Sequence, residues 1–527
     1  MKGEINMKKT KLIAATMTAL LLVSCAKTPA TEPTTTAAET TAAAAETTAE
    51  VTEETEASET TAYTPVPDLT VEALEALDGV TRVEDLSVVR QEGYNYQNAD
   101  KSNFVVYFEQ PLDWNDPSKG TFEQRVTIAF NGSKNSEFYV GGYFLNDNIL
   151  TGQKYFDTYA VSHVINYISA EYRFFGKSRP EDLDNNSPKY WEYLTSYNAA
   201  CDFHHIITEL KKVMPGSWMM AGASKGGVAT MVQAMYFPDD ANVFVPQIAP
   251  VMSSPQEEIF VKNIYETIGD DRYGPEQAAA YRQLVLDFQV EAIKNREALQ
   301  DRVWEYLTKD SNEYTDMATP EIVFDHVVLS FAIRTWQYAQ DFESIQNVLD
   351  LKGEDGYVDE IYYLLTGDKP ADEETPPYVT EYDPVPYDYY PYYVQCMKEL
   401  GYFKADFSYL RDALEKDGSG AKLVVTEDME DMFNLKLFIQ PEVLETLSFD
   451  ISLHDDLVNW SQTTDANVIM LFGGSDVWYP LRLPDVPDRE NFHTFVDDSD
   501  AHGRIYSHID LYSRSDIQDL IDEAMKR

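Results

Sequence analysis

Cysteine and positive charge are both scarce in this sequence. Three cysteines occur in 527 residues, at positions 25, 201 and 396. So few thiols cannot make a disulfide framework, and Cys201 and Cys396 are expected to be buried free thiols. Only 41 Lys and Arg face 90 Asp and Glu, which gives a formal net charge of −49. A surface this acidic repels phosphate backbones, so nucleic acid is excluded as a partner.

Zinc-binding patterns are lacking as well. The cysteines and histidines do not have zinc-ligand spacing, and the adjacent His204 and His205 are expected to belong to a helix rather than to a metal site. We therefore expect no metal and no cofactor. A chain of 527 residues is longer than a domain with one ordinary hydrophobic core, so we expect two folded units or one enlarged domain.

Residues 1–25 have the pattern of a signal peptide. Lysines at positions 8, 9 and 11 precede an apolar run over 12–23, which is too short for a comfortable membrane span. The run ends in Leu22-Val23-Ser24-Cys25, which resembles a bacterial lipobox whose cysteine is lipidated. An ordinary signal peptide with an incidental cysteine is the alternative. The lipobox predicts a lipoprotein anchored to a membrane through Cys25, at the bacterial cell surface or in the periplasm.

Residues 26–65 consist almost entirely of Thr, Ala, Glu and Pro. Such a segment cannot bury a core, so we expect a disordered, acidic tether. Its expected role is to hold the folded part away from a membrane or cell wall.

Residues 66–254 predict the first part of an α/β domain. A helix over 70–77 and a strand over 86–90 open it, and continuous apolar strands then alternate with helix-like segments. This rhythm is typical of a mainly parallel sheet that is covered on both faces.

Residues 255–450 are mostly helical in pattern, with strand-like sequence returning at 467–472 and 491–496. We interpret 255–450 as a helical cap inserted between sheet strands. The alternative, a separate second domain, would leave the sheet without its last strands. Residues 451–527 then form the second part of the α/β domain and end in a helix over 515–526.

The stretch from Ser217 to Val228 carries a serine at the apex of a predicted strand, turn and helix. Its pattern Gly222-x-Ser224-x-Gly226 is that of a nucleophile elbow, whose glycines leave room for a strained turn that exposes the serine oxygen. An elbow serine needs a base, and the base needs a carboxylate to orient it. In the α/β-hydrolase fold the acid and then the histidine follow the serine in the chain, each at a strand end.

Asp476 occupies the place expected for the acid. The strand over 467–472 runs into Gly473-Gly474-Ser475-Asp476, a turn that the glycines loosen. A loop or helix-capping aspartate is the alternative interpretation. Asp465 precedes this strand, and the later Asp485 and Asp488 lie in a proline-rich loop.

Three histidines remain for the base. His502 lies in the loop after the strand over 491–496 and is the preferred candidate. His493 lies within that strand, where a packed or edge residue is expected, and His508 falls in the segment that leads to the last helix. Both remain alternatives.

The oxyanion hole is expected to consist of backbone donors. One is the N–H of Lys225, the residue after the nucleophile, and another comes from the turn Gly141-Gly142-Tyr143 that follows a predicted strand. Gly142 and Tyr143 are the candidates there. The Lys225 side chain is expected to form a structural ion pair.

Glu171 and Arg173 are expected to form a buried salt-bridged pair rather than to act in catalysis. They belong to Glu171-Tyr172-Arg173-Phe174-Phe175-Gly176, a segment that directly follows a predicted buried strand. Buried charges are normally paired, which favours this structural interpretation.

Four motifs together resemble one family. They occur in the order Phe108-Glu109-Gln110-Pro111-Leu112-Asp113, Gly120-Thr121-Phe122-Glu123-Gln124-Arg125, Glu171-Tyr172-Arg173-Phe174-Phe175-Gly176 and Gly222-Ala223-Ser224-Lys225-Gly226-Gly227. This set is similar to the secreted tripeptidyl aminopeptidases, relatives of lysosomal prolyl carboxypeptidase and dipeptidyl peptidase. Trp336-Gln337-Tyr338 in the cap resembles the same group.

The resemblance implies an α/β-hydrolase fold with an inserted helical cap, and exopeptidase action from the substrate N-terminus. It assigns Ser224 as nucleophile, Asp476 as acid and His502 as base. The family tends to have histidine where this chain has Trp114 and Tyr172, which leaves the detailed substrate preference open.

Three functions are consistent with these residues. The preferred one is a lipid-anchored serine exopeptidase that releases short N-terminal peptides. Its expected partners are peptide or unfolded-protein substrates with a free N-terminus. The second is a carboxylic-ester hydrolase with the same triad. The third is a catalytically inactive surface binding protein on a hydrolase scaffold.

Overall fold

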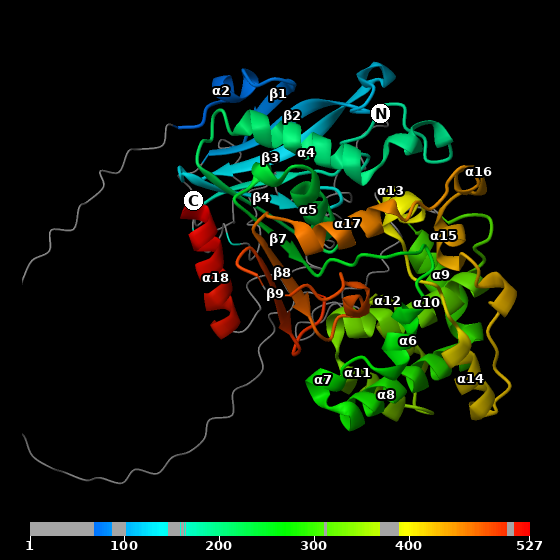
Figure 1. Ribbon diagram of the computed structural model, residues 1–527. Helices are drawn as coiled ribbons and strands as arrows, with labels where there is room; N and C mark the ends of the chain where they lie inside the picture. Colours follow the sequence, from blue (N-terminus) through cyan, green and yellow to red (C-terminus); the bar gives the residue numbers. More distant parts are fainter. Residues whose placement is uncertain are drawn as a thin grey trace, which may run out of the picture.

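Among the residues that the structure describes, nine strands form one continuous sheet at the centre of the protein (Figure 1). The computed structural model describes residues 68–86, 102–145, 159, 163, 165–309, 314–368, 389–487, 489–502 and 511–526. The strands lie in the order β1-β2-β3-β5-β4-β6-β7-β8-β9. Their bounds are β1 Val80–Asp85, β2 Ser102–Pro111, β3 Thr121–Phe130, β4 Asn135–Val140, β5 Asn166–Ala170, β6 Ser217–Ala223, β7 Val243–Gln247, β8 Val468–Gly473 and β9 Phe492–Asp497.

The sheet is antiparallel at its β1 edge and parallel elsewhere. The pairs β1–β2, β2–β3 and β3–β5 are antiparallel, and every pairing from β5 to β9 is parallel. The carboxyl ends of parallel strands meet at one edge of a sheet, where ligands bind in open α/β folds. The segments that follow β4, β6, β8 and β9 are therefore brought to a common edge.

Helices cover both faces of the sheet because successive strand side chains point to opposite sides. In β6, Trp218 and Met220 belong to the core beneath α4 (Ser196–Leu210), α5 (Lys225–Tyr236) and α17 (Ser452–Thr463). Met219 and Ala221 belong to the core on the opposite face, which α18 (Leu511–Lys526) covers (Figure 1). The fold class is α/β, as predicted.

Most of the chain between β7 and β8 forms a helical cap with a core of its own. β7 and β8 are neighbours in the sheet, so the chain leaves the sheet after β7 and returns to it at β8. Figure 1 shows these helices gathered beside the sheet. They are α6 Ile259–Glu266, α7 Asp270–Tyr273, α8 Pro275–Lys294, α9 Arg296–Thr308, α10 Pro320–Arg334, α11 Phe342–Asp350, α12 Tyr357–Thr366, α13 Tyr390–Gln395, α14 Ser408–Asp417, α15 Phe433–Phe438 and α16 Pro441–Leu444.

Part of this segment packs against the sheet domain instead. Val394 of α13 and Val443 of α16 belong to the core shared with the sheet, whereas α8 and α10 contribute to the separate core of the cap. Lys398 donates hydrogen bonds from Nζ to the carbonyls of Trp191 and Leu194. The segment around α13 therefore joins the cap to the α/β core.

Two elements near the start of the fold differ from the sequence-based expectation. The predicted helix over 70–77 is α2 (Val71–Glu75), and the Thr70 side chain caps it by accepting from the Ala73 N–H at 3.2 Å. The strand predicted over 86–90 lies outside the described residues except for Leu86, and an unpredicted strand, β1 (Val80–Asp85), lies next to β2. Its position is set by pairing with β2, as in Val83 opposite Val106, which local periodicity cannot reveal.

Several predictions concern parts of the chain outside the described residues. These are the signal peptide with Cys25, the acidic tether and His508. Cys201 and Cys396 are described, and both are buried free thiols as predicted. Among the helices in the described ranges, none combines the length and apolarity required to cross a membrane.

Candidate active site

Ser224 lies at the sharp turn between β6 and α5, where its backbone adopts φ 55° and ψ −123°. A positive φ is uncommon for a residue with a side chain and is strained. Two hydrogen bonds hold the turn: the Ser224 N–H donates to the carbonyl of Gln247 at 2.9 Å, and its carbonyl accepts from the Val228 N–H at 3.0 Å. The serine is half-buried, so its side chain retains access to solvent.

The glycines of the elbow are required by close backbone contacts. A Cβ on Gly222 would lie 2.4 Å from the carbonyl oxygen of Gly226, and a Cβ on Gly226 would lie 2.0 Å from that of Val140. Both distances are too short for any side chain. The pattern Gly-x-Ser-x-Gly therefore permits the end of β4 and the start of α5 to approach closely beneath Ser224.

The predicted oxyanion donors lie together. Lys225 is the first residue of α5, and N–H groups in the first turn of a helix have no partner within the helix. Gly142, at φ 80°, packs directly on the Lys225–Gly226 backbone, since a Cβ there would lie 2.7 Å from the Gly226 nitrogen. The turn after β4 thus lies against the helix start that carries Ser224.

Within the part of the chain that the structure describes, the Lys225 side chain does not form the ion pair that we expected. It is buried, and Nζ donates a 2.7 Å hydrogen bond to the carbonyl of Gly142. Nζ also lies 3.0 Å from the centroid of the Tyr172 ring and 4.9 Å from that of Phe175. Burial holds the pKa of Lys225 well below its ordinary value. The aromatic faces and the carbonyl replace the expected carboxylate as partners of the ammonium.

Asp476 and His502 form a buried hydrogen-bonded pair. Asp476 follows β8, His502 follows β9, and Asp476 Oδ2 lies 2.7 Å from His502 Nδ1. The other carboxylate oxygen accepts from the Trp478 N–H at 3.0 Å. An acceptor at Nδ1 places the Nδ1 proton toward the carboxylate, which leaves Nε2 available as a base.

Close packing of two loops brings the acid and the base together. A Cβ on Gly473 would lie 2.4 Å from the carbonyl oxygen of Ala501, and the Ser475 N–H donates to the carbonyl of Asp500 at 2.8 Å. The glycines before Asp476 therefore allow the loop after β9 to lie directly against the loop after β8.

The structure does not join all three triad candidates directly. Ser224, Asp476 and His502 lie at the carboxyl ends of β6, β8 and β9, at one edge of the parallel sheet. Within the described ranges, Ser224 Oγ makes no hydrogen bond to His502. Catalytic hydrogen bonds are often long in the absence of substrate. The alternative base His493 lies within β9 and contacts the Glu490 carbonyl instead.

The cap contributes a contact that the sequence alone did not indicate. The His502 N–H donates to the carbonyl of Gln337 at 3.2 Å, and the rings of Tyr338 and Trp478 lie 6.2 and 6.4 Å from the imidazole. Gln337 belongs to Trp336-Gln337-Tyr338, but nothing local in that motif indicates a position beside the base.

Glu171 and Arg173 are both buried and ion-paired, but not with each other as expected. Glu171 pairs with Arg125 at 2.7 Å, and Arg173 pairs with Asp202 at 2.7 Å. The Trp114 indole N–H also donates to Asp202, at 2.7 Å. These pairs lie beneath the strand ends and support the loops around the site.

Residues able to hold a metal meet in a different region. Asp78, His205 and Glu209 bring three potential ligand atoms together on the turn before β1 and on α4. This cluster lies by β1, the outermost strand on one side of the sheet, whereas the triad candidates lie at the carboxyl ends of β6, β8 and β9.

The family model described as PS-10 peptidase S37 matches residues 71–416. The chain belongs to the PS-10 peptidase S37 family. This match includes the elbow and much of the cap, and it confirms the predicted relationship to the tripeptidyl aminopeptidases. It follows that the protein is a serine peptidase with peptide substrates.

Individual relatives agree with membership of the S37 family. The prolyl tri/tetrapeptidyl aminopeptidase of Streptomyces mobaraensis is 24% identical over 426 residues, which cover 77% of this chain and 76% of the relative. Among solved structures, the proline iminopeptidase of Mycobacterium smegmatis is 13% identical over 80% of this chain and 98% of its own, with a TM-score of 0.32. An acetylester hydrolase from Corynebacterium glutamicum is 11% identical over 84% and 100%, with a TM-score of 0.34. The α/β-hydrolase class rests on the strand order and the elbow rather than on these scores.

Proposed function

We propose that this S37 peptidase is an extracytoplasmic serine exopeptidase that releases short peptides, chiefly tripeptides, from free N-termini. Ser224 is the nucleophile, His502 the base and Asp476 the acid. The observation that carries this proposal is the buried Asp476–His502 hydrogen bond at the same sheet edge as the strained turn of Ser224. This arrangement supplies the base and orienting carboxylate that an elbow serine requires.

In the proposed reaction, Ser224 Oγ attacks the carbonyl carbon of the scissile peptide bond while its proton moves to His502 Nε2. The Asp476 carboxylate accepts the Nδ1 proton and stabilises the imidazolium. His502 then donates its proton to the leaving amine, which releases the shortened chain and leaves the peptide esterified to Ser224. A water that His502 deprotonates hydrolyses this ester.

The developing oxyanion is bound by backbone N–H groups of Lys225 and of the Gly142–Tyr143 turn. The Gly142 carbonyl and the Tyr143 N–H belong to one peptide unit, and Lys225 Nζ donates a hydrogen bond to that carbonyl. In a trans peptide the N–H points away from the C=O. The hydrogen bond from Lys225 therefore fixes the direction in which the Tyr143 N–H points.

The preference for chain ends is supported by the cap and by one relative. The relative from Streptomyces mobaraensis is named for removal of tri- and tetrapeptides. The cap lies next to the catalytic pair through Gln337 and His502. A cap at this position restricts access to narrow, unfolded chain ends. In this proposal a lipid on Cys25 anchors the enzyme to a membrane, outside the cytoplasm.

One peptide assay tests the proposed activity. An unstructured peptide is incubated with the enzyme in two forms, with a free and with an acetylated N-terminus, and the products are identified by mass spectrometry. We expect tripeptides from the free form and no product from the acetylated form. Ser224→Ala should lower kcat by roughly 10⁶-fold, leaving what the oxyanion hole and binding provide.

The outcomes separate the alternatives. Cleavage within the acetylated peptide would show an endopeptidase, and rapid turnover of a chromogenic ester without peptide release would favour an esterase. Labelling by a fluorophosphonate that is equal in the wild type and in Ser224→Ala would exclude Ser224 as the nucleophile. The anchor is tested by Cys25→Ser, which should move the enzyme from the membrane fraction into the soluble fraction of the producing bacterium.

A further inference from the structure

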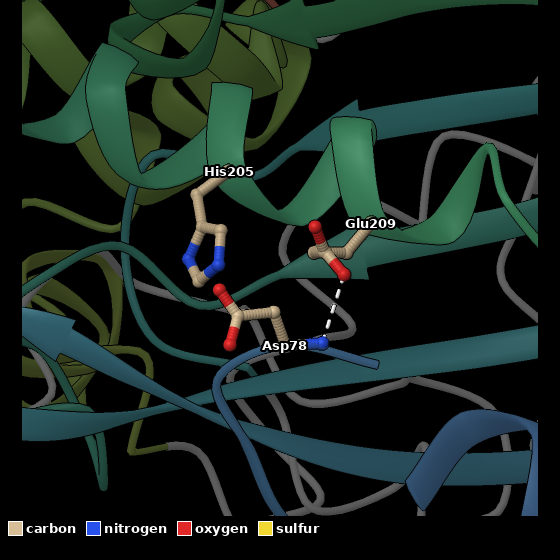
Figure 2. Close-up of side chains that lie close together, drawn as sticks. All are labelled: Asp78, His205 and Glu209. Carbon is tan, nitrogen blue, oxygen red and sulfur yellow. Dashed lines mark hydrogen bonds between the residues drawn. The ribbon is translucent and has the colours of Figure 1, made fainter. Parts of the chain in front are cut away.

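Asp78, His205 and Glu209 form a cluster that plays no part in the proposed peptidase reaction. Their potential ligand atoms all lie within 4.8 Å of one another. His205 and Glu209 are four residues apart on α4, so they share one face of the helix. Figure 2 shows the imidazole above the Asp78 carboxylate, with the Glu209 carboxylate beside them.

The backbone of the turn before β1 is held close to this imidazole. Gly79 has φ 76°, and a Cβ on it would lie 2.7 Å from His205 Cε1 and 3.3 Å from Nε2. The Asp78 N–H donates to Glu209 Oε2 at 2.8 Å. A glycine at position 79 thus lets the turn approach α4 closely enough to place Asp78 beside both helix residues.

A relay of buried amides determines which nitrogen of His205 carries the proton. Gln124 Nε2 donates to the Glu171 carbonyl, so its Oε1 accepts from Gln110 Nε2 at 2.9 Å. Gln110 Nε2 also donates to the Asp202 carbonyl at 3.2 Å. The remaining Gln110 atom, Oε1, can only accept, and it lies 2.8 Å from His205 Nδ1. His205 Nδ1 is therefore the donor.

The relay leaves the Nε2 lone pair of a neutral His205 in the cluster. Gln110 and Gln124 are fully buried, so the amide orientation that fixes this tautomer is itself rigid. A metal-ligating histidine usually donates the N–H of its other ring nitrogen to a nearby acceptor, which orients the ring. Gln110 Oε1 is that acceptor for His205.

The other two members of the cluster supply negative charge. The Glu209 carboxylate is buried and accepts hydrogen bonds from Lys212 Nζ and from the Asp78 N–H. Asp78 is exposed. The Lys212 ammonium is bound to Glu209 Oε1 and offsets one of the two charges. An imidazole lone pair and two carboxylates face each other, and a cation between them would relieve their repulsion.

We propose that Asp78, His205 and Glu209 bind one divalent transition-metal ion, with Zn²⁺ the best match. One imidazole nitrogen and two carboxylate oxygens are ligands that suit zinc, whereas calcium and magnesium favour oxygen alone. Asp78 is exposed, so water can complete the coordination. The ion would tie the turn before the edge strand β1 to α4, and its role would be to stabilise the fold rather than to take part in peptide cleavage.

Calorimetric titration of the purified, untagged enzyme with ZnCl₂ tests this proposal, with thermal melting as a second readout. We expect one Zn²⁺ per chain at this site and a rise in Tm, because a ligand bound by the folded state alone stabilises it. His205→Gln should weaken binding by about tenfold or more, the scale on which even outer supports of metal ligands act. It should also abolish most of the rise in Tm.

His204→Gln is the matched control, because it changes the adjacent residue of the same helix. His204 contacts Asp240 through Nδ1 and is not a member of the cluster. This variant should bind Zn²⁺ like the wild type. Equal weakening in both variants, or no Zn²⁺ binding by the wild type, would overturn the proposal. Ca²⁺ binding that matches Zn²⁺ and survives His205→Gln would show an acidic surface site in its place.

Discussion

The Lys225 amino group lies beside the proposed oxyanion site among aromatic rings, and within the described residues it makes no hydrogen bond to a carboxylate. Its bond to the Gly142 carbonyl is 2.7 Å long, and the face of Tyr172 covers Nζ. A buried ammonium is costly to desolvate, so its retention here indicates a role other than stability. We assign it to positioning the Gly142–Tyr143 peptide.

Lys225→Met tests this assignment, since the thioether has similar length and no charge. We expect kcat to fall by about 10- to 100-fold with little change in KM, somewhat less than the cost of deleting an oxyanion donor outright. The Tm should be unchanged or higher, because the desolvation of a buried charge is removed. Steady-state kinetics and thermal melting measure the two effects separately.

Tyr172→Phe serves as the comparison, because it removes only the hydroxyl and keeps the ring face over Nζ. It should retain kcat close to that of the wild type. If Lys225→Met lowered Tm and kcat together, the lysine would be a structural residue. An unchanged kcat would remove it from the site altogether.

At the scale of elements, α10 forms the centre of the cap. Nearly every residue of this helix is buried, including His326. The ring of His326 lies 5.7 Å from that of Phe438 and 6.0 Å from that of Phe433. Burial lowers the pKa of His326 from 6.5 to about 4. The cap core therefore favours the neutral form of this side chain.

This histidine should make the stability of the cap depend on pH. The unfolded chain binds a proton at His326 below about pH 6.5, whereas the folded protein binds it only below about pH 4. Stability is therefore lost as the pH falls through this window, by roughly 3 kcal/mol in total. Urea unfolding of the wild type and of His326→Leu at several pH values measures the difference.

The two proteins are compared at pH 8, where the histidine is neutral in both folded and unfolded chains. Their difference in unfolding free energy at that pH reports packing alone. The difference should then shift in favour of His326→Leu as the pH falls toward 4. A difference that stays constant with pH would contradict the lowered pKa.

At the scale of the whole molecule, the net charge of −49 dominates long-range interactions. A strongly negative surface attracts cations and repels anions before contact, and salt screens this effect with a Debye length of about 8 Å at physiological ionic strength. The charge should therefore bias the enzyme toward basic peptide substrates at low salt.

Two unstructured peptides with the same N-terminal tripeptide test this bias, one with a lysine-rich and one with a glutamate-rich remainder. We expect kcat/KM for the basic peptide to fall as NaCl is raised, and that for the acidic peptide to rise. Equal salt responses would show that the surface charge has no effect on substrate capture and serves solubility alone.

The parts of the fold that follow from local patterns could be predicted from the sequence. Glycines at 222 and 226 predicted the elbow because a tight turn constrains its own residues, and the close contacts of both glycines agree with that reason. The order of Ser224, Asp476 and His502 along the chain, each after a strand, was also visible. The α/β class followed from the alternation of strands and helices, and the mostly parallel sheet with helices on both faces confirms it.

Pairings between distant segments could not be predicted in the same way. Lys225 was expected to meet a carboxylate and instead contacts Tyr172 and the Gly142 carbonyl. Glu171 and Arg173, close in sequence, each pair with a residue from another element, Arg125 and Asp202. Each outcome depends on which groups β3, α4 and the segments after β4 and β5 bring to the same buried space.

His205 illustrates the division. The sequence correctly placed it in a helix, because helical periodicity is a property of neighbouring residues. Its partners Asp78 and Gln110 come from the turn before β1 and from β2, and they meet it only once the sheet has formed beneath α4. Local periodicity and turn chemistry thus determined the elements and the elbow, whereas burial and pairing across the folded sheet decided the partners of each charged side chain.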